Sequence, residues 1–134
     1  MLHLVLEDRH IIGQQKRLGV HSTKHEHLAV VFEDDGETGY FYAINMQESQ
    51  PIVDSLSVYN VSGIESLHEP RQVQICWSED GNQAFFLVNG YPHAAFDFIR
   101  LVGYNHSKYP LPELGSMWSH ENITDKLVEE WLTP

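Results

Sequence analysis

Two acidic turns, each between runs of β-branched and aromatic residues, constrain the fold of this chain most strongly. Both turns contain an Asp-Gly pair, Asp35-Gly36 in the first and Asp80-Gly81 in the second. Apolar residues alternate over 27–33 before the first turn, and the aromatic run Tyr40-Phe41-Tyr42-Ala43-Ile44 follows it. Because Asp tolerates and Gly supplies a positive φ, such turns are typical of β-hairpins. The sequence therefore predicts two hairpins, the second over 73–88.

Other segments extend this β pattern. Asn89-Gly90 predicts a third turn, after which the run 93–102 returns as a strand. Alternating leucines over 2–6 predict a short N-terminal strand, and apolar residues within 11–20 predict a second, weaker one. Residues 51–59 fit a strand by their β-branched content, although their apolar spacing also fits a helix; we favour the strand. The expected fold is mainly β (α+β), an antiparallel meander folded as a barrel or a sandwich.

The C-terminal third departs from this pattern. Residues 103–120 contain two glycines and two prolines and are expected to form an extended loop. A C-terminal helix is predicted over 122–132, with Asn122 as its cap and an apolar face formed by Ile123, Leu127 and Trp131. No repeat or linker divides the chain, so residues 1–134 are expected to form a single domain.

The net charge of the chain limits the classes of molecule that it is expected to bind. The 134 residues include 19 Asp and Glu against 8 Lys and Arg, a net charge of −11. Such a charge argues against a nucleic-acid backbone or an anionic membrane as the main partner, because both would repel the protein. The negative charge concentrates in 26–97, which holds twelve acids and Arg71 as its only Lys or Arg. A protein partner of opposite charge is compatible with this distribution.

Targeting signals and cysteine content point to the cytoplasm. No apolar run approaches the roughly 18 residues that a membrane-spanning helix needs. The N-terminal residues 1–8 lack the basic start of a secretory signal and reach Glu7 and Asp8 before an apolar core is complete. Cys76, the one cysteine, has no partner for an intramolecular disulfide, and its apolar surroundings indicate a buried thiol. We therefore expect a cytoplasmic protein.

Three closely spaced histidines are a candidate metal site. His21, His25 and His27 follow an H-x-x-x-H-x-H pattern. On a strand, His25 and His27 would share a face and could bind one transition metal, with His21 or Glu26 completing the set after a bend. The spacing matches no closed zinc motif, so the alternative is a solvated loop that enters a strand.

The first acidic turn is a candidate binding surface. Glu33, Asp34, Asp35 and Glu37 place four carboxylates within five residues, where they could face a basic partner. Tyr40 and Tyr42 share a strand face, and tyrosines on such a face can form a recognition surface. The spacing is not that of an EF-hand, and hairpin turns are rich in Asp and Gly for conformational reasons alone.

His93 and Asp97 are the third candidate. On a strand, residues four apart share a face, so this pair could orient an imidazole for acid–base chemistry. The alternative is a buried Asp97 that ties its strand to a neighbouring turn by hydrogen bonds. Neither a nucleophile elbow nor a glycine-rich phosphate loop occurs in the chain. An enzyme is therefore the less favoured class, and no cofactor is predicted.

Three segments together resemble a known family. These segments are 31–43, with the acidic turn and the aromatic run; 77–81, Trp-Ser-Glu-Asp-Gly; and 89–98, Asn-Gly-Tyr-Pro-His-Ala-Ala-Phe-Asp-Phe. They resemble a family of small uncharacterised bacterial proteins, classed as a domain of unknown function, over about residues 28–100. The resemblance implies a bacterial, cytosolic domain and no particular activity.

Three hypotheses of function follow. The leading one is a non-enzymatic acidic domain that binds, and in binding neutralises, a basic protein. The first alternative is a metal-binding protein or metal-dependent enzyme that uses a histidine cluster. The second is a structural homo-oligomer, such as a homodimer, paired through an exposed strand edge or aromatic face.

Overall fold

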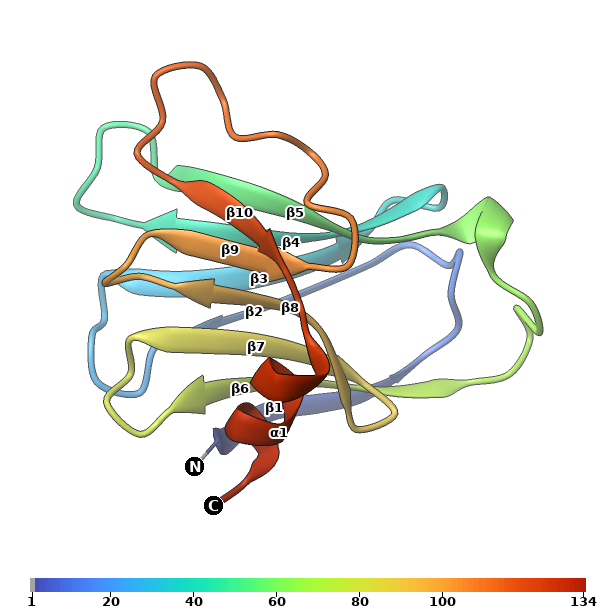
Figure 1. Ribbon diagram of the computed structural model, residues 1–134. Helices are drawn as coiled ribbons and strands as arrows, with labels where there is room; N and C mark the ends of the chain where they lie inside the picture. Colours follow the sequence, from blue (N-terminus) through green and yellow to red (C-terminus); the bar gives the residue numbers. More distant parts are fainter. Residues whose placement is uncertain (1) are drawn as a thin grey trace.

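The protein is a sandwich of two β-sheets in the computed structural model, which describes residues 2–134 (Figure 1). The six-stranded sheet has the order β1-β6-β7-β8-β9-β10 and the four-stranded sheet the order β2-β3-β4-β5. Of the two architectures expected, the sandwich is therefore the one found. The six-stranded sheet comprises β1 (Leu2–His10), β6 (Arg71–Ser78), β7 (Gln83–Val88), β8 (Tyr91–Asp97), β9 (Val102–Asn105) and β10 (Ser119–Asn122). The other comprises β2 (Lys16–His21), β3 (Leu28–Asp34), β4 (Thr38–Asn45) and β5 (Ile52–Asn60).

The hairpins expected at the Asp-Gly turns are confirmed. β3 pairs antiparallel with β4, and β6 with β7. Gly36 and Gly81 have φ values of 97° and 73°, in the region that glycine adopts without strain. The third turn, at Asn89-Gly90, joins β7 to β8 with positive φ at both residues. Residues 52–60 form a strand, as favoured above.

The chain crosses twice between the sheets at one end of the sandwich. It leaves β1 for β2 through residues 11–15 and returns from β5 to β6 through the short 3-10 helix η1 (Val61–Gly63) and residues 64–70. The turn between β4 and β5 lies at the opposite end of the sandwich (Figure 1).

Stacked phenylalanines join the two sheets. Phe86 on β7 stacks on Phe32 of β3, with ring centroids 4.3 Å apart and an angle of 15° between the planes. Phe96 on β8 stacks on Phe41 of β4 at 5.2 Å. All four side chains are at most 1% exposed. Their inward positions follow from the two-residue period of each strand.

A bulge in β1 changes the face of the expected leucine series. The pairing of β1 with β6 shifts between Leu4 and Leu6. Leu6 consequently packs into the core between the sheets, whereas Leu4 is 53% exposed. The simple alternation predicted for residues 2–6 is therefore wrong, because one inserted residue exchanges the faces of all residues beyond it.

The C-terminal part differs from the expected continuous loop. Residues 103–120 include most of β9 and the start of β10, which pair in parallel, so only residues 106–118 form a loop. The helix α1 (Asp125–Leu132) confirms the predicted C-terminal helix. Its cap is Thr124, whose hydroxyl oxygen accepts a hydrogen bond from Leu127 N. Asn122 belongs to β10, so its expected capping role is wrong. A helix that is long and apolar enough to cross a membrane does not occur in residues 2–134.

Gly39 gives a direct test of the packing within the four-stranded sheet. A Cβ atom at this position would lie 2.7–2.9 Å from ring carbons of Tyr59, on the adjacent strand. We expect Gly39→Ala to lower the free energy of unfolding by about 1–3 kcal/mol, because the ring must move. Gly63→Ala is the matched control, since nothing lies within 4 Å of its added Cβ. Urea unfolding that gives equal losses for the two variants would contradict this packing.

Candidate functional site

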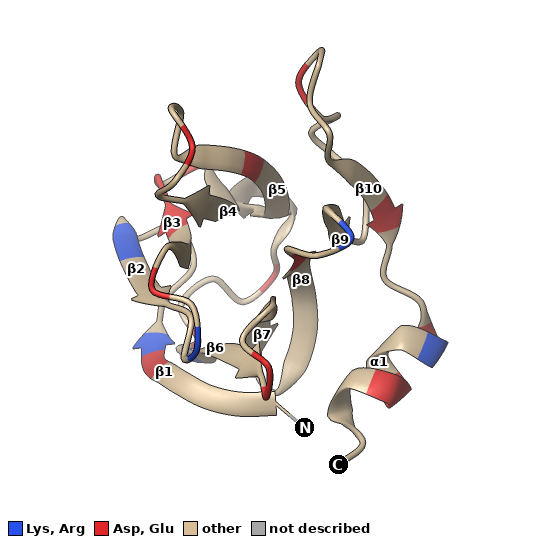
Figure 2. Ribbon diagram, turned by 90° about the vertical axis from the view of Figure 1, so that its left-hand side faces the viewer, with Lys and Arg blue, Asp and Glu red and all other residues tan. Residues whose placement is uncertain are grey.

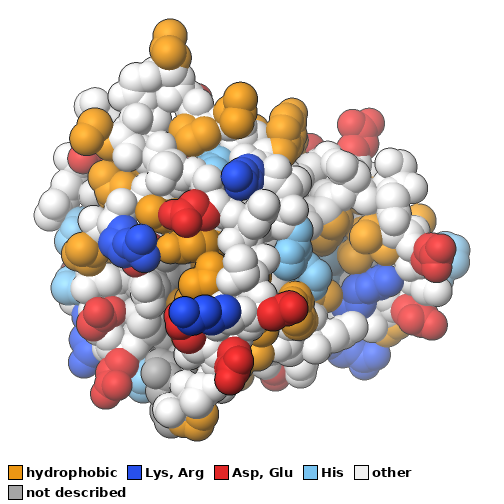
Figure 3. Space-filling view, in the orientation of Figure 1, with side chains coloured by type: hydrophobic (Ala, Val, Ile, Leu, Met, Phe, Trp, Pro, Cys, Tyr) orange, Lys and Arg blue, Asp and Glu red, His pale blue; other side chains and the backbone are white. Residues whose placement is uncertain are grey.

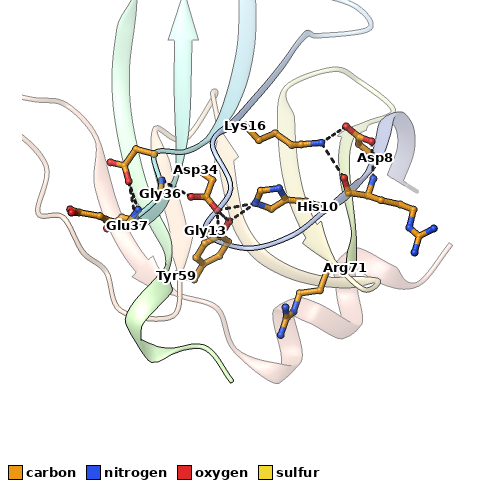
Figure 4. Close-up of polar contacts among 12 residues, drawn as sticks. Asp8, His10, Gly13, Lys16, Asp34, Gly36, Glu37, Tyr59 and Arg71 are labelled. Carbon is orange, nitrogen blue, oxygen red and sulfur yellow. Dashed lines mark hydrogen bonds and ion pairs between the residues drawn. The ribbon is translucent and has the colours of Figure 1, made fainter. Parts of the chain in front are cut away.

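A closed polar network lies at the end where the chain crosses between the sheets (Figure 4). The Asp34 Oδ2 atom accepts a hydrogen bond from the Tyr59 hydroxyl at 2.6 Å and from Gly13 N at 2.9 Å, and it lies 2.9 Å from His10 Nε2. Its Oδ1 atom accepts from Gly36 N at 2.9 Å. The side chains of His10 and Asp34 are fully excluded from solvent. The network thus ties the end of β1, the first crossing segment and β5 to β3 in the interior of the protein.

Position in β3 explains why Asp34 is buried. The strand runs one residue beyond the expected segment 27–33, so Asp34 continues the inward series Leu28, Val30 and Phe32. Burial would raise the pKa of the Asp34 carboxyl, but hydrogen bonds from Tyr59, Gly13, His10 and Gly36 outweigh it and lower the pKa below its usual value. Burial and the adjacent Asp34 raise the pKa of the Tyr59 hydroxyl. Asp34 therefore belongs to the interior, which corrects its expected place on a binding surface.

A second buried His–Asp pair joins β10 to β5 near the other end of the sandwich. His120 Nε2 lies 2.9 and 2.8 Å from the two carboxylate oxygens of Asp54, and His120 Nδ1 lies 3.1 Å from the Lys108 carbonyl oxygen. The two side chains are 2% and 4% exposed. Both ring nitrogens are engaged in structural contacts, so this ring has no free nitrogen to act as a general base.

An open cleft of about 430 Å³ lies at this same end. We call it the end cleft; it is formed by the β4–β5 turn, the β8–β9 turn and the loop 106–118. Its apolar lining includes the nearly buried Trp118 and the more open Ile52, Leu114 and Met117, which are 59%, 107% and 82% exposed. Figure 3 shows hydrophobic side chains gathered along the upper edge of the molecule, over this loop. The remaining lining residues are Asn45, Glu48, Ser49, Gln50, Val53, Phe98, Leu101, Glu113, Gly115 and Ser116.

The end cleft carries charge of one sign. Glu48 and Glu113 lie in its lining, both exposed, and no Lys, Arg or His is among the lining residues. Neither carboxylate forms an ion pair within residues 2–134. None of the residues that line the end cleft was predicted as a site residue. A usable signal was the presence of Leu111, Leu114 and Met117 among the prolines and glycines of 103–120, because loops run over the surface.

The histidines predicted as metal ligands do not lie on a strand together. His25 and His27 occupy the turn before β3, and their ring centroids are 6.1 Å apart. His21 Nδ1 contacts the Glu26 carbonyl at 2.8 Å, and His25 Nε2 contacts the Asp80 carbonyl at 3.1 Å. Within the described residues, no group of three or more His, Cys, Asp or Glu is placed to hold a metal ion. The expected shared strand face is therefore wrong, because β3 begins at Leu28.

The acidic turn is largely occupied by its own contacts. Glu33 pairs with Arg17 of β2, and Asp35 accepts hydrogen bonds from Glu37 N and Thr38 N. Tyr40 and Tyr42 are half-buried on the outer face of the four-stranded sheet, with ring centroids 5.9 Å apart. A role of Glu33, Asp35, Glu37 and the two tyrosines in binding stays a prediction.

His93 lies at an irregularity of β8, whereas Asp97 lies in the regularly paired part of the strand. The β7–β8 register shifts between Phe86, which pairs with Ala94, and Leu87, which pairs with Pro92. His93 therefore has no partner on β7. The His93 ring contacts His106 at 5.1 Å between centroids, and burial followed by the charge of His106 lowers the pKa of His93 to about 4. Asp97 accepts from Gln83 Nε2, Ile99 N and Arg100 N, each at 3.0 Å. Asp97 therefore ties β8 to the following turn, as the alternative held, and an acid–base role of the His93–Asp97 pair stays a prediction.

Acidic residues occur along many of the strands, turns and the helix rather than in one element (Figure 2). Of the 19 Asp and Glu residues, Asp34, Asp54 and Asp97 are buried, which leaves 16 acids at the surface against 8 Lys and Arg. The surface is therefore strongly negative even without the buried carboxylates.

Comparisons with known proteins place the chain in a family. It is 61% identical over 133 residues to a protein of Haemophilus influenzae described as an uncharacterized protein, a match that covers 98% of this chain and 83% of the relative. No solved structure matches the chain. A family model described as an uncharacterized protein conserved in bacteria (DUF2251) matches residues 10–132. These matches confirm the resemblance to uncharacterised bacterial proteins, and the chain belongs to the DUF2251 family.

Proposed function

We propose that this protein is a non-enzymatic acidic domain that binds a basic protein partner, and that the end cleft holds an apolar and cationic segment of that partner. The observation that carries the proposal is the combination found in the cleft: an apolar lining with two unpaired carboxylates and no cationic side chain. Neutralisation of a basic partner is the consequence we expect from such binding.

The apolar part of the cleft supports a binding role. Exposed apolar side chains cost free energy in water unless they are covered, and clusters of them mark sites of interaction. Ile52, Leu114 and Met117 surround a floor that includes Trp118. The volume lies within the range of pockets that hold small ligands or anchoring side chains. Methionine at the rim can adapt to the shape of an anchor.

The charge of the cleft supports a cationic partner. Glu48 and Glu113 have no counterion among the described residues and lie on a surface with twice as many acids as bases. An Arg or Lys side chain has an apolar stem and a cationic head, so it matches both parts of the lining. An anionic partner would meet two carboxylates and no compensating base.

Both buried His–Asp pairs support a non-enzymatic role. His10 and Asp34 are closed to solvent, and His120 has both ring nitrogens engaged. The two pairs act in folding and loop placement. A catalytic base needs a nitrogen or oxygen that can reach a substrate.

A peptide titration tests the proposal. The probe is a capped ten-residue peptide of alternating leucine and arginine, compared with a leucine–glutamate and a serine–arginine peptide of equal length, with affinities measured by calorimetry. We expect the leucine–arginine peptide to bind most tightly. The double variant Glu48→Gln, Glu113→Gln should weaken this binding about tenfold, since two charge contacts are lost.

The matched control removes the same charge elsewhere. Glu129 and Glu130 are exposed on α1, which packs on the outer face of the six-stranded sheet. Glu129→Gln, Glu130→Gln should change the affinity by less than about twofold. Equal losses in both double variants would show binding to net charge alone and would overturn the proposal. The proposal would also be overturned if light scattering without peptide showed a dimer of the protein and this dimer did not bind the peptide.

A further inference from the structure

The loop 106–118 is anchored firmly at its start. Its residues 113–118 line the end cleft. Asn105, which is fully buried, donates through Nδ2 to the carbonyl oxygens of Ser57 and Tyr109 at 2.9 and 2.8 Å. Its Oδ1 atom accepts from Lys108 N at 2.6 Å. The loop therefore forms one wall of the cleft, and its first turn is fixed to β5.

His120 fastens the same wall from the other side. Its ring lies between the Asp54 carboxylate on β5 and the Lys108 carbonyl oxygen in the loop, at 2.8–2.9 and 3.1 Å. Gly103 on β9 makes room for this contact, because a Cβ there would lie 2.9 Å from Asp54 Oδ2 and 3.1 Å from His120 Cδ2. Three elements and the loop therefore meet at one imidazole ring.

Both ring nitrogens of His120 face oxygens that accept hydrogen bonds. A carbonyl oxygen cannot donate, and an ionised carboxylate only accepts. A neutral imidazole carries one N–H and could satisfy only one of these two partners, whereas the imidazolium donates to both. We infer that His120 is held as the imidazolium cation, and that this charge keeps the loop 106–118 closed as the wall of the end cleft. Loss of the proton releases the wall.

The surroundings of the ring agree with this inference. The charged group that faces it is the Asp54 carboxylate from β5; β9 presents Gly103, and the loop presents the carbonyl oxygens of Lys108 and Pro110. Within β10, the neighbouring side chains of Ser119 and Glu121 point to the opposite face. Burial lowers the pKa of His120, but the Asp54 carboxylate and the two carbonyl oxygens outweigh it and raise the pKa above its usual value.

This direction fixes the sign of the pH dependence. Because the pKa is raised in the closed state, the stabilisation is complete below the ordinary histidine pKa of about 6.5 and is lost as pH rises through the raised value. Between these two values, the opening constant of the loop should grow about tenfold per pH unit. Above the raised value it should reach a plateau.

Two measurements on the full chain, without any ligand, test the inference. Heteronuclear NMR of the imidazole nitrogens should show His120 doubly protonated at about pH 6.5, where His93 is neutral. Hydrogen exchange of amides 107–118, corrected for intrinsic rates, should lose protection about tenfold or more from about pH 6 to pH 9, while amides of β7 keep theirs.

Variants distinguish the effect of the His120 charge on the loop from the general stability of the fold. Asp54→Asn should reduce loop protection about tenfold at about pH 6 and lower the pKa of His120, because the carboxylate no longer stabilises the imidazolium. His120→Gln should remove the pH dependence, and His106→Gln, at an exposed loop position, should preserve it. A singly protonated His120 at about pH 6.5, or loop protection independent of both pH and Asp54, would overturn the inference.

The functional consequence rests on the proposed function. If the closed wall shapes the cleft, the leucine–arginine peptide should bind about threefold or more weakly at pH 9 than at pH 6.5 in the wild type, and equally in His120→Gln. The protonation of His120 and the hydrogen exchange of the loop are measured without peptide. A failure of the inference about His120 is therefore distinguishable from a failure of peptide binding.

Discussion

Replacing Asp34 with alanine is expected to lower the free energy of unfolding by about 3–5 kcal/mol, because the buried partners of its carboxylate lose their acceptor. These partners are the Tyr59 hydroxyl, the His10 ring and the backbone N–H groups of Gly13 and Gly36. Urea unfolding at neutral pH measures the loss. Asp35→Ala is the matched control: this neighbouring carboxylate is exposed and accepts two backbone N–H groups of its own turn.

Acid should remove this difference between wild type and Asp34→Ala. Because the folded-state pKa of Asp34 is lowered, its contribution is present above the ordinary aspartate pKa of about 3.9 and is lost as pH falls through the lowered value. Unfolding of both proteins at neutral pH and in acid separates this effect from general acid destabilisation. A loss in Asp34→Ala no larger than that in Asp35→Ala, or one that does not shrink in acid, would contradict the structural role of the network.

Phe86→Ala should have a similarly large effect, about 3–5 kcal/mol, by opening a cavity between the two sheets. The ring is fully buried, stacks on Phe32 at 4.3 Å and lies 5.7 Å from Phe41, so its loss affects both sheets. Ile99→Ala, at a side chain that is 71% exposed, should change stability by less than about 0.5 kcal/mol. Similar urea midpoints for the two variants would contradict this assignment of the core.

Local sequence signals predicted much of the fold. The hairpins at Asp35-Gly36 and Asp80-Gly81 form because these turns depend on residues adjacent in the chain. The apolar face of the C-terminal helix was equally visible: Ile123, Leu127 and Trp131 pack against the outer cluster of the six-stranded sheet, where the Trp131 ring meets Phe85. Periodicity and turn chemistry act over a few residues, so one sequence suffices to recognise them.

Features set by register or by distant contacts were not predictable in this way. The bulge between Leu4 and Leu6 and the irregularity at His93 depend on the partner strand, and the bulge places Leu4 and Leu6 on opposite faces. His10 meets Asp34 across 24 residues, and His120 meets Asp54 across 66. The end cleft likewise combines two turns and a loop that are distant in sequence. Such sites follow from the pairing of whole sheets and leave no local motif.

If the end cleft binds a segment with both apolar and cationic groups, NMR mapping should locate the leucine–arginine peptide there. We predict that peptide-dependent shift changes concentrate in residues 45–53 and 113–118, with Phe98 and Leu101. Shift changes centred instead on the acidic turn at Glu33 and Glu37, or on α1, would show that the end cleft is not the binding site. An absence of shift changes with a peptide concentration in the millimolar range would contradict binding at the end cleft equally.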